Sequence, residues 1–421
     1  MRNRRNFIKK TTLGLLGLGT VAAKSMAHHP FGSPENLRQA KHDDELFALV
    51  KESLLLSKDL VYLNTGSLGP SPAWLVNRIS VLMNELESNP VGNNWGELGQ
   101  EMEAVRQKIA HFIKAQAEEI ILTRNTTEGI NLIGSCLKLQ KGDEILTTTH
   151  EHGGGENGLK YLAKQQGAVL RKMQLPMPLT DKNELIDVIK KQISTNTKVL
   201  MLSHINTITG LKMPFEAIAE FTRPKGILLM ADGAQAVGML EVDVQKLGVD
   251  VYATSGHKWL LGPKETGFVF IRKDLQPRIQ HVFTQSSYAA YSASSGTRNV
   301  ASIIGLGKIL DWHQLIGLAK IENRCQTLAL YCRQQLMEMP QLEMMSPTST
   351  DLSAGIVSVL LKKGTNQEIF TKMRKQQIIV KKLPIYNALR FSTHIFNSRE
   401  EVDRMIKVLK AFICFFLLGT N

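Results

Sequence analysis

Three side chains with complementary chemistry fall in two short segments of the chain. Asp232 and Gln235 lie in the segment MADGAQAVG, and Lys258 lies in TSGHKWLLGP. An apolar run at 226–231 predicts a buried strand ending near the acid, and a second short strand at 250–253 leads to the Ser-Gly-His-Lys turn. Because functional groups gather at the carboxyl ends of strands in an open α/β sheet, we expect the carboxylate and the amine to share one site.

A lysine amine and a carboxylate at one sheet edge suit pyridoxal 5'-phosphate (PLP). The amine forms a Schiff base with the aldehyde, and the carboxylate keeps the pyridine nitrogen protonated, which makes the ring an electron sink. The segments Ser255–Lys258 and Ala231–Gln235 resemble the Schiff-base and pyridine-binding signatures of the class V, fold-type I PLP-dependent enzymes. That family includes aminotransferases, cysteine desulfurases, kynureninases and isopenicillin N epimerases. The resemblance implies that Lys258 also moves the Cα proton of the substrate as a general base.

The same resemblance implies further contacts with the cofactor. Thr126 and Thr127 open a predicted helix after a strand, where free N–H groups suit a phosphate. Ser255 and His257 are expected to donate to the same phosphate. His152, in the segment THEHGGG, is expected to stack on the pyridine ring, and it joins the acid and the lysine as a catalytic residue.

Asn206 and Gln235 are expected to hydrogen-bond the phenolic oxygen of the cofactor. His150 and His152 form a His-x-His pair that can also bind zinc, but no third ligand follows at a suitable spacing. We therefore predict no metal site.

Two later motifs point to a partner subunit and to the substrate. Thr297, in SGTRN, resembles a family loop that reaches the phosphate of the partner subunit, which implies a homodimer with shared active sites. An interdomain linker is the alternative for that segment. Arg390, in ALRFSTHIFN, matches a late strand whose arginine grips the substrate α-carboxylate. A guanidinium suits this bidentate task, and a surface arginine is the alternative.

These motifs specify the cofactor better than the reaction. The segment 378–387 has no cysteine ahead of Arg390, which is unfavourable for a cysteine desulfurase. The forms NTTEG, HEHGGG and GTRN look closest to isopenicillin N epimerase-like proteins, so epimerase- or aminotransferase-like chemistry on an amino acid is expected. A PLP-dependent lyase of the desulfurase type and a non-catalytic PLP-binding protein remain alternatives. The sequence contains neither GxGxxG nor GxxxxGK[ST].

Residues 1–27 predict an export signal. They carry six basic residues and no acid, an apolar stretch at 13–19 that is too short to cross a bilayer, and a small-x-small site at 25–27. The run RRNFIK resembles the twin-arginine pattern, which predicts a periplasmic protein without a transmembrane segment; a plain secretory signal is the alternative. The net charge of +13 comes without a basic motif interleaved with aromatics, so no nucleic-acid partner is expected.

The pattern of elements predicts an α/β fold resembling fold type I of the PLP-dependent transferases. A large PLP-binding domain with a mostly parallel sheet flanked by helices is expected at 61–296, and a smaller α+β domain at 28–60 and 297–421. Strands are expected at 60–63, 119–122, 144–148, 169–173, 199–202, 227–231 and 266–271, with helices at 43–56, 126–137, 156–165, 184–191 and 214–221.

Overall fold

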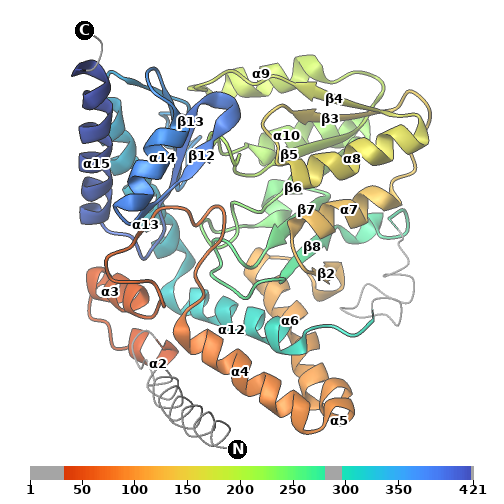
Figure 1. Ribbon diagram of the computed structural model, residues 1–421. Helices are drawn as coiled ribbons and strands as arrows, with labels where there is room; N and C mark the ends of the chain where they lie inside the picture. The colour runs from red at the N-terminus through yellow and green to blue at the C-terminus, as the bar shows by residue number, and fades with distance from the viewer. Residues whose placement is uncertain (1–32, 280–295, 419–421) are drawn as a thin grey trace, which may run out of the picture.

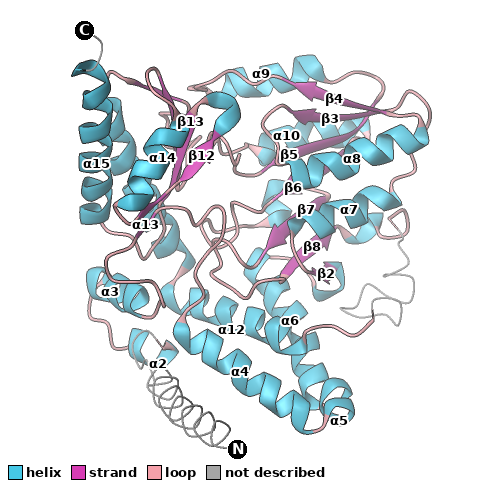
Figure 2. Ribbon diagram, in the orientation of Figure 1, coloured by secondary structure: helices cyan, strands magenta, loops and turns pink. Residues whose placement is uncertain are grey.

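A seven-stranded sheet forms the centre of the larger part of the molecule (Figures 1 and 2). The computed structural model describes residues 33–279 and 296–418. The strand order is β2-β8-β7-β6-β5-β3-β4, and every pairing is parallel except those of β8 with β2 and β7. The strands are β2 (Ile120–Thr123), β3 (Glu144–Thr148), β4 (Val169–Met173), β5 (Thr197–Ser203), β6 (Leu228–Asp232), β7 (Val251–Ser255) and β8 (Gly267–Ile271).

Helices cover both faces of this sheet, which explains why its central strands are apolar on both sides. Side chains alternate between two cores: Leu146 and Tyr252 join the core under α6, α9, α10 and α12, whereas Ile145 and Val251 join the core under α7 and α8. The helices are α4 (Ala73–Ser88), α5 (Pro90–Trp95), α6 (Glu97–Ile113), α7 (Thr126–Cys136), α8 (Gly153–Gln166), α9 (Lys182–Gln192), α10 (Phe215–Thr222), α11 (Val244–Leu247) and α12 (Val300–Ile316).

A four-stranded antiparallel sheet, drawn in blue in Figure 1, lies beside the large one. Its order is β12-β13-β10-β9, and α13, α14 and α15 share its apolar core. A short parallel pairing of β1 with β11 joins the N-terminal part of the chain to this region. The elements are α2 (Pro34–Leu37), α3 (Asp43–Glu52), β1 (Val61–Tyr62), α13 (Leu318–Met337), β9 (Leu342–Met344), β10 (Ile356–Leu361), α14 (Asn366–Lys375), β11 (Ile378–Ile379), β12 (Lys381–Leu383), β13 (Ala388–Ser392) and α15 (Arg399–Leu418).

The α/β class and the mostly parallel sheet are confirmed, but several element bounds differ from expectation. The first helix ends at Glu52 rather than at residue 56, because Leu54 forms a bridge with Pro72. Helix α8 begins at Gly153 rather than at residue 156, because the preceding His152 acts as its N-cap. Helix α5 was not expected. The domain boundaries remain a prediction; α12, which follows the boundary at 296, packs on α4 and α6.

The predicted signal at 1–27 lies outside the described residues. No helix in the described part of the chain is long and apolar enough to cross a membrane. Across residues 33–279 and 296–412, no group of three or more His, Cys, Asp or Glu side chains could hold a metal ion.

Candidate active site

A cavity of about 660 Å³ lies at the carboxyl ends of the central parallel strands. It brings together side chains that are up to 324 positions apart in the chain, from the loop before α4 to strand β13. Nine of the predicted site residues line it: Thr126, Thr127, His152, Asp232, Gln235, Ser255, His257, Lys258 and Arg390. The loop at 64–70 contributes Gly66 and Ser67.

Lys258 follows β7 in a tight turn and extends into the cavity. Burial lowers the pKa of its amine to about 8; Asp232 opposes this shift and Arg390 adds to it. A larger fraction of the amine is therefore neutral near physiological pH than in an ordinary lysine, which favours attack on an aldehyde. The loop before α4 fits closely against this turn, because Gly69 N–H donates to His257 O at 2.8 Å and a Cβ on Gly69 would meet Lys258 O at 2.0 Å.

Asp232 ends strand β6 and is only 7% exposed. Its Oδ1 accepts the Ala234 N–H at 2.9 Å. Burial raises the pKa of this carboxyl, while Lys258, the Ala234 N–H and His152 oppose the rise. Among the described residues no cation forms a salt bridge with Asp232, although the charge of Lys258 acts on it; a pyridinium nitrogen would supply a directly bonded opposite charge.

The N-terminus of α7 meets the end of β7 in a cluster of donors suited to phosphate. Thr126 N–H donates to Ser255 Oγ at 2.9 Å, and the two hydroxyl oxygens are 2.7 Å apart. Helix α7 begins at Thr126, and its N-cap is Asn125, whose side chain accepts the Glu128 N–H. His257 keeps a buried Nδ1 without a hydrogen-bond partner among the described residues. Hydroxyl groups and an imidazole nitrogen beside a helix N-terminus fit an anion.

His152 lines the cavity from the start of α8. Its Nδ1 accepts the Gly154 N–H at 3.1 Å, which fixes the orientation of the ring. Burial, followed by the charge of Lys258, lowers the pKa of His152. A neutral imidazole held in this way can lie against an aromatic ring face, as the sequence predicts.

Gln235 and Asn206 have different surroundings. Gln235 Nε2 donates to Gly66 O at 2.8 Å, and its Oε1 accepts from Trp259 Nε1 at 2.7 Å, so the amide is held at the cavity wall. Asn206 is buried and does not line the cavity. Its Oδ1 accepts the N–H groups of residues 208 and 209, and its Nδ2 donates to His150 O. Asn206 therefore stabilises its own turn and is not at the cavity wall, where the next residue, Thr207, lies. Its contact with the phenolic oxygen of the cofactor remains a prediction.

Arg390 reaches the cavity from β13 and is 2% exposed. Its guanidinium donates only to neutral groups: Thr207 O and Oγ1 at 3.0 and 2.8 Å, Ser67 Oγ at 3.0 Å and Asn64 Oδ1 at 3.3 Å. Nε has no partner among the described residues. Burial lowers the pKa of Arg390 to about 10, against a small opposing effect of Tyr62. The expected alternative, a surface arginine, is excluded by this burial.

Thr297 is exposed and does not line the cavity. Its expected contact with a partner subunit remains a prediction.

Glu151, which no sequence motif marked as a site residue, also lines the cavity. One carboxylate oxygen accepts from Thr148 Oγ1 at 2.7 Å, and the other accepts from Ser203 Oγ. Burial raises the pKa of Glu151 to about 7; the two hydroxyl groups oppose this shift, and the charge of Asp232 adds to it. Its position in the sequence could have predicted this role, because Glu151 follows a buried strand at the same ends of the strands as Asp232.

The cavity thus holds what PLP requires: an amine, an anion for the ring nitrogen, a donor cluster for the phosphate and an imidazole.

Comparison with known proteins agrees with this geometry. The family model for aminotransferase class-V matches residues 61–405. Isopenicillin N epimerase from Amycolatopsis lactamdurans is 27% identical over 391 residues, covering 86% of this chain and 98% of the relative. A cysteine desulfurase from Serratia proteamaculans is 32% identical over 344 residues, covering 75% and 83%.

A solved structure shows the same fold. It is a mutant of C-DES with glycine covalently linked to the PLP cofactor, and it aligns with a TM-score of 0.76 at 23% identity over 85% of this chain and 97% of that one. The cofactor of this chain is pyridoxal 5'-phosphate. The chain belongs to the class-V aminotransferase family.

Proposed function

We propose that this protein uses PLP held on Lys258 to act at Cα of an amino acid or an amino-acid-derived substrate, as an epimerase or an aminotransferase. The observation that carries the proposal is the pairing of Lys258 with Arg390 in one cavity. Arg390 is a buried cation whose partners are all neutral. Since a buried charge is costly without an opposite charge, an incoming carboxylate is the natural partner.

The chain's own residues divide the chemistry in a simple way. Bound PLP supplies an aldehyde for capture by an amine and a ring that withdraws electrons from Cα. Asp232 holds the proton on the ring nitrogen, and Arg390 fixes the α-carboxylate of the substrate. Lys258, with its amine freed by the substrate, takes the Cα proton as a general base. An epimerase would also need a proton donor on the opposite face of Cα, whereas an aminotransferase would release a 2-oxo acid.

A desulfurase-like lyase is the second candidate, because a curated cysteine desulfurase is 32% identical. That reaction needs a mobile cysteine near the substrate. The segment at 378–387 has none, and no cysteine lines the cavity among the described residues. Cys136, Cys325 and Cys332 are buried, and burial raises the pKa of all three thiols, to about 11 for Cys136 and to about 12 for Cys332. Raised thiol pKa values oppose nucleophilic cysteine chemistry.

Exchange of the Cα hydrogen in deuterated buffer tests the proposal across a panel of amino acids. Exchange together with the opposite enantiomer identifies an epimerase, and exchange with release of a 2-oxo acid identifies an aminotransferase. Turnover of cysteine but of no other amino acid, with release of alanine and transfer of the sulfur to an added acceptor thiol as a persulfide, would support the second candidate. A holoenzyme that exchanges no amino acid would contradict the proposal.

We also propose that residues 1–27 direct twin-arginine export to the periplasm and that the mature protein is a homodimer to which Thr297 contributes across the interface. The basic and apolar pattern of residues 1–27 supports export, and the resemblance of SGTRN to a subunit-bridging loop supports the dimer. Replacing Arg4 and Arg5 by lysine should retain the loaded protein in the cytoplasm. Sedimentation should give a dimer, and a monomeric holoenzyme with full activity would contradict this part.

A further inference from the structure

A second cation lies beside Arg390 and belongs to the same cavity. In the antiparallel pairing of β12 with β13, Lys381 lies directly opposite Arg390. Alternation along β12 places Lys381 and Leu383 in the cavity lining and turns Lys382 to the other side. Lys382 donates to Gln367 on α14, on the side that holds the apolar core of the small sheet.

This arrangement sets two like charges directly across a strand pair, which is unfavourable unless something compensates them. The pKa of Lys381 is lowered, first by burial and then by the charges of Arg390 and Lys382. The pKa of His152 is lowered first by burial and then by the charge of Lys258, and Lys381 adds a smaller contribution. Within the described residues, neither Lys381 nor Arg390 forms a salt bridge.

The two acids of the cavity do not provide the compensation. Asp232 and Glu151 lie at the ends of the large sheet and belong to its hydrogen-bond network. A single substrate carboxylate would neutralise Arg390 and leave Lys381 without a counter-ion. Lys381 is exposed at the cavity wall, where a flexible ammonium can follow a second negative group on a side chain.

We propose that Lys381 selects substrates with a second anionic group, so that the natural substrate is an amino acid with an acidic side chain or an acidic extension of it. Arg390 binds the α-carboxylate, and Lys381 binds the second anion at the neighbouring position on the sheet. This inference rests on the proposed function, because it assumes that Arg390 holds the α-carboxylate.

Matched pairs of amino acids test the inference on the holoenzyme. Cα-hydrogen exchange is measured for aspartate against asparagine, glutamate against glutamine, and 2-aminoadipate against norleucine. The wild type should favour the acidic member of at least one pair by about tenfold in kcat/KM, which is the effect of one charged hydrogen bond. In Lys381→Met this preference should disappear through a rise in KM for the acidic member, with the neutral member unchanged.

Two further variants distinguish selection of acidic substrates by Lys381 from an effect of any substitution in β12. Lys381→Arg should keep the preference, and Lys382→Met, which changes the neighbouring lysine on the opposite side of the strand, should behave as the wild type. If Lys381→Met leaves the ratio of acidic to neutral substrates unchanged, or lowers both members equally, the inference is overturned.

Measurement of ligand binding without turnover tells whether the role of Lys381 or the proposed function is wrong. Calorimetric titration of the holoenzyme with glutarate and with butyrate should show tighter binding of the diacid in the wild type but not in Lys381→Met. If the enzyme shows this binding but exchanges the Cα hydrogen of no amino acid, the binding of two anionic groups by Arg390 and Lys381 is supported and the proposed function is refuted. If amino acids are exchanged with no preference for the acidic ones, and glutarate and butyrate bind equally, the role of Lys381 is refuted and the proposed function stands.

Discussion

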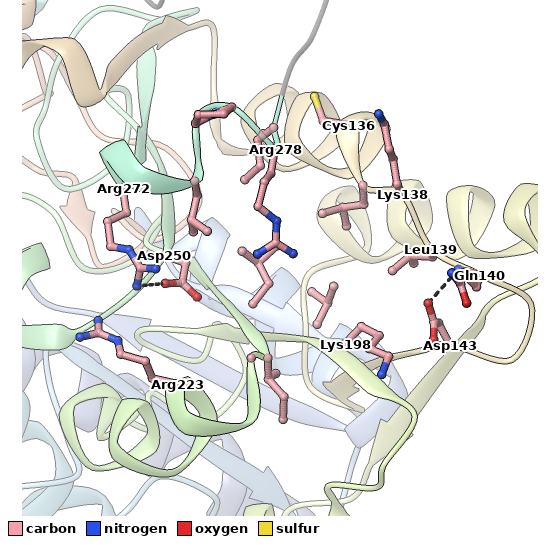
Figure 3. A pocket seen from close by; sticks show the side chains of 18 residues that line it. Cys136, Lys138, Leu139, Gln140, Asp143, Lys198, Arg223, Asp250, Arg272 and Arg278 are labelled. Atoms are coloured by element: carbon pink, nitrogen blue, oxygen red, sulfur yellow. Dashed lines mark hydrogen bonds and ion pairs between the residues drawn. The ribbon is translucent and has the colours of Figure 1, made fainter.

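Two hollows of different character lie at opposite ends of the strands of the large sheet. The active-site cavity, of about 660 Å³, is the smaller hollow, and the larger hollow, of about 860 Å³, lies at the amino ends of the parallel strands (Figure 3). Its charged groups are largely satisfied: Arg272 pairs with Asp250 and Asp274, and Arg223 donates to Gly248 O. Lys138, Lys198 and Arg278, which also line it, are exposed.

The smaller hollow contains buried charged groups that form no salt bridge with any described residue. Asp232 and Arg390 are nearly inaccessible to solvent, and no ion pair among the described residues includes either of them or Lys258. Charges in such positions oppose folding unless a ligand compensates them. Unpaired buried charge at the carboxyl edge of the strands, rather than volume, therefore distinguishes the reaction site in this molecule.

The largest expected effect on activity comes from comparing two lysines, Lys258 in the active-site cavity and Lys198 in the larger hollow. Lys258→Ala should reduce Cα-hydrogen exchange by at least about 1000-fold, since the variant loses both the attachment point and the general base. Lys198→Ala, at the opposite hollow, should leave exchange unchanged. Deuterium incorporation followed by mass spectrometry measures both. Equal activity of the two variants would contradict the assignment of the site.

Replacement of Arg390 should weaken substrate binding while the cofactor is retained. For Arg390→Ala we expect KM to rise about 100-fold, because a carboxylate loses a buried charged partner. Arg278→Ala changes an arginine of the larger hollow and serves as the control. An unaltered KM in Arg390→Ala, with normal PLP absorbance, would remove Arg390 from the substrate site.

The buried acid Glu151 should make stability depend on pH in the cofactor-free protein. Its folded pKa of about 7 exceeds the ordinary value of 4.5, so the carboxyl is neutral in both states at low pH and its contribution to stability is lost as pH rises between these values. Glu151→Gln removes this loss. The variant should therefore gain roughly 3 kcal/mol relative to the wild type between pH 4.5 and pH 7. Urea unfolding at pH 5 and pH 8 measures the gain, and a constant difference would contradict it.

Capture of PLP by the cofactor-free protein should follow the amine of Lys258. Because burial lowers the pKa of that amine to about 8, the neutral fraction rises with pH up to that region and then levels off. We expect the capture rate to increase about tenfold from pH 7 to pH 9 and to change little above it. Stopped-flow absorbance measures the rate, and a continued rise to pH 10.5 would indicate an unshifted lysine.

The sequence predicted the part of the site that rests on short contiguous motifs. Asp232 and Lys258 each follow a buried strand, so local pattern and strand order were enough to place them at one edge. Whether residue 206 or 207 reaches the cavity wall could not be predicted, because it depends on how a turn closes its own hydrogen bonds.

Other features depend on contacts between distant segments. The environment of Glu151 needs hydroxyl groups from the ends of β3 and β5, which are separated by 55 positions. The antiparallel direction of β8 and the pairing of Lys381 with Arg390 are likewise set by tertiary packing. Single-sequence periodicity carries no information about such pairings.

Reduction of the holoenzyme with borohydride, followed by peptide mapping, tests the central claim most directly. The treatment fixes PLP to the amine that carries it, and the peptide containing Lys258 should hold the label in stoichiometric amount. A label on another lysine, or a fully reduced protein with Lys258 unmodified, would contradict the account.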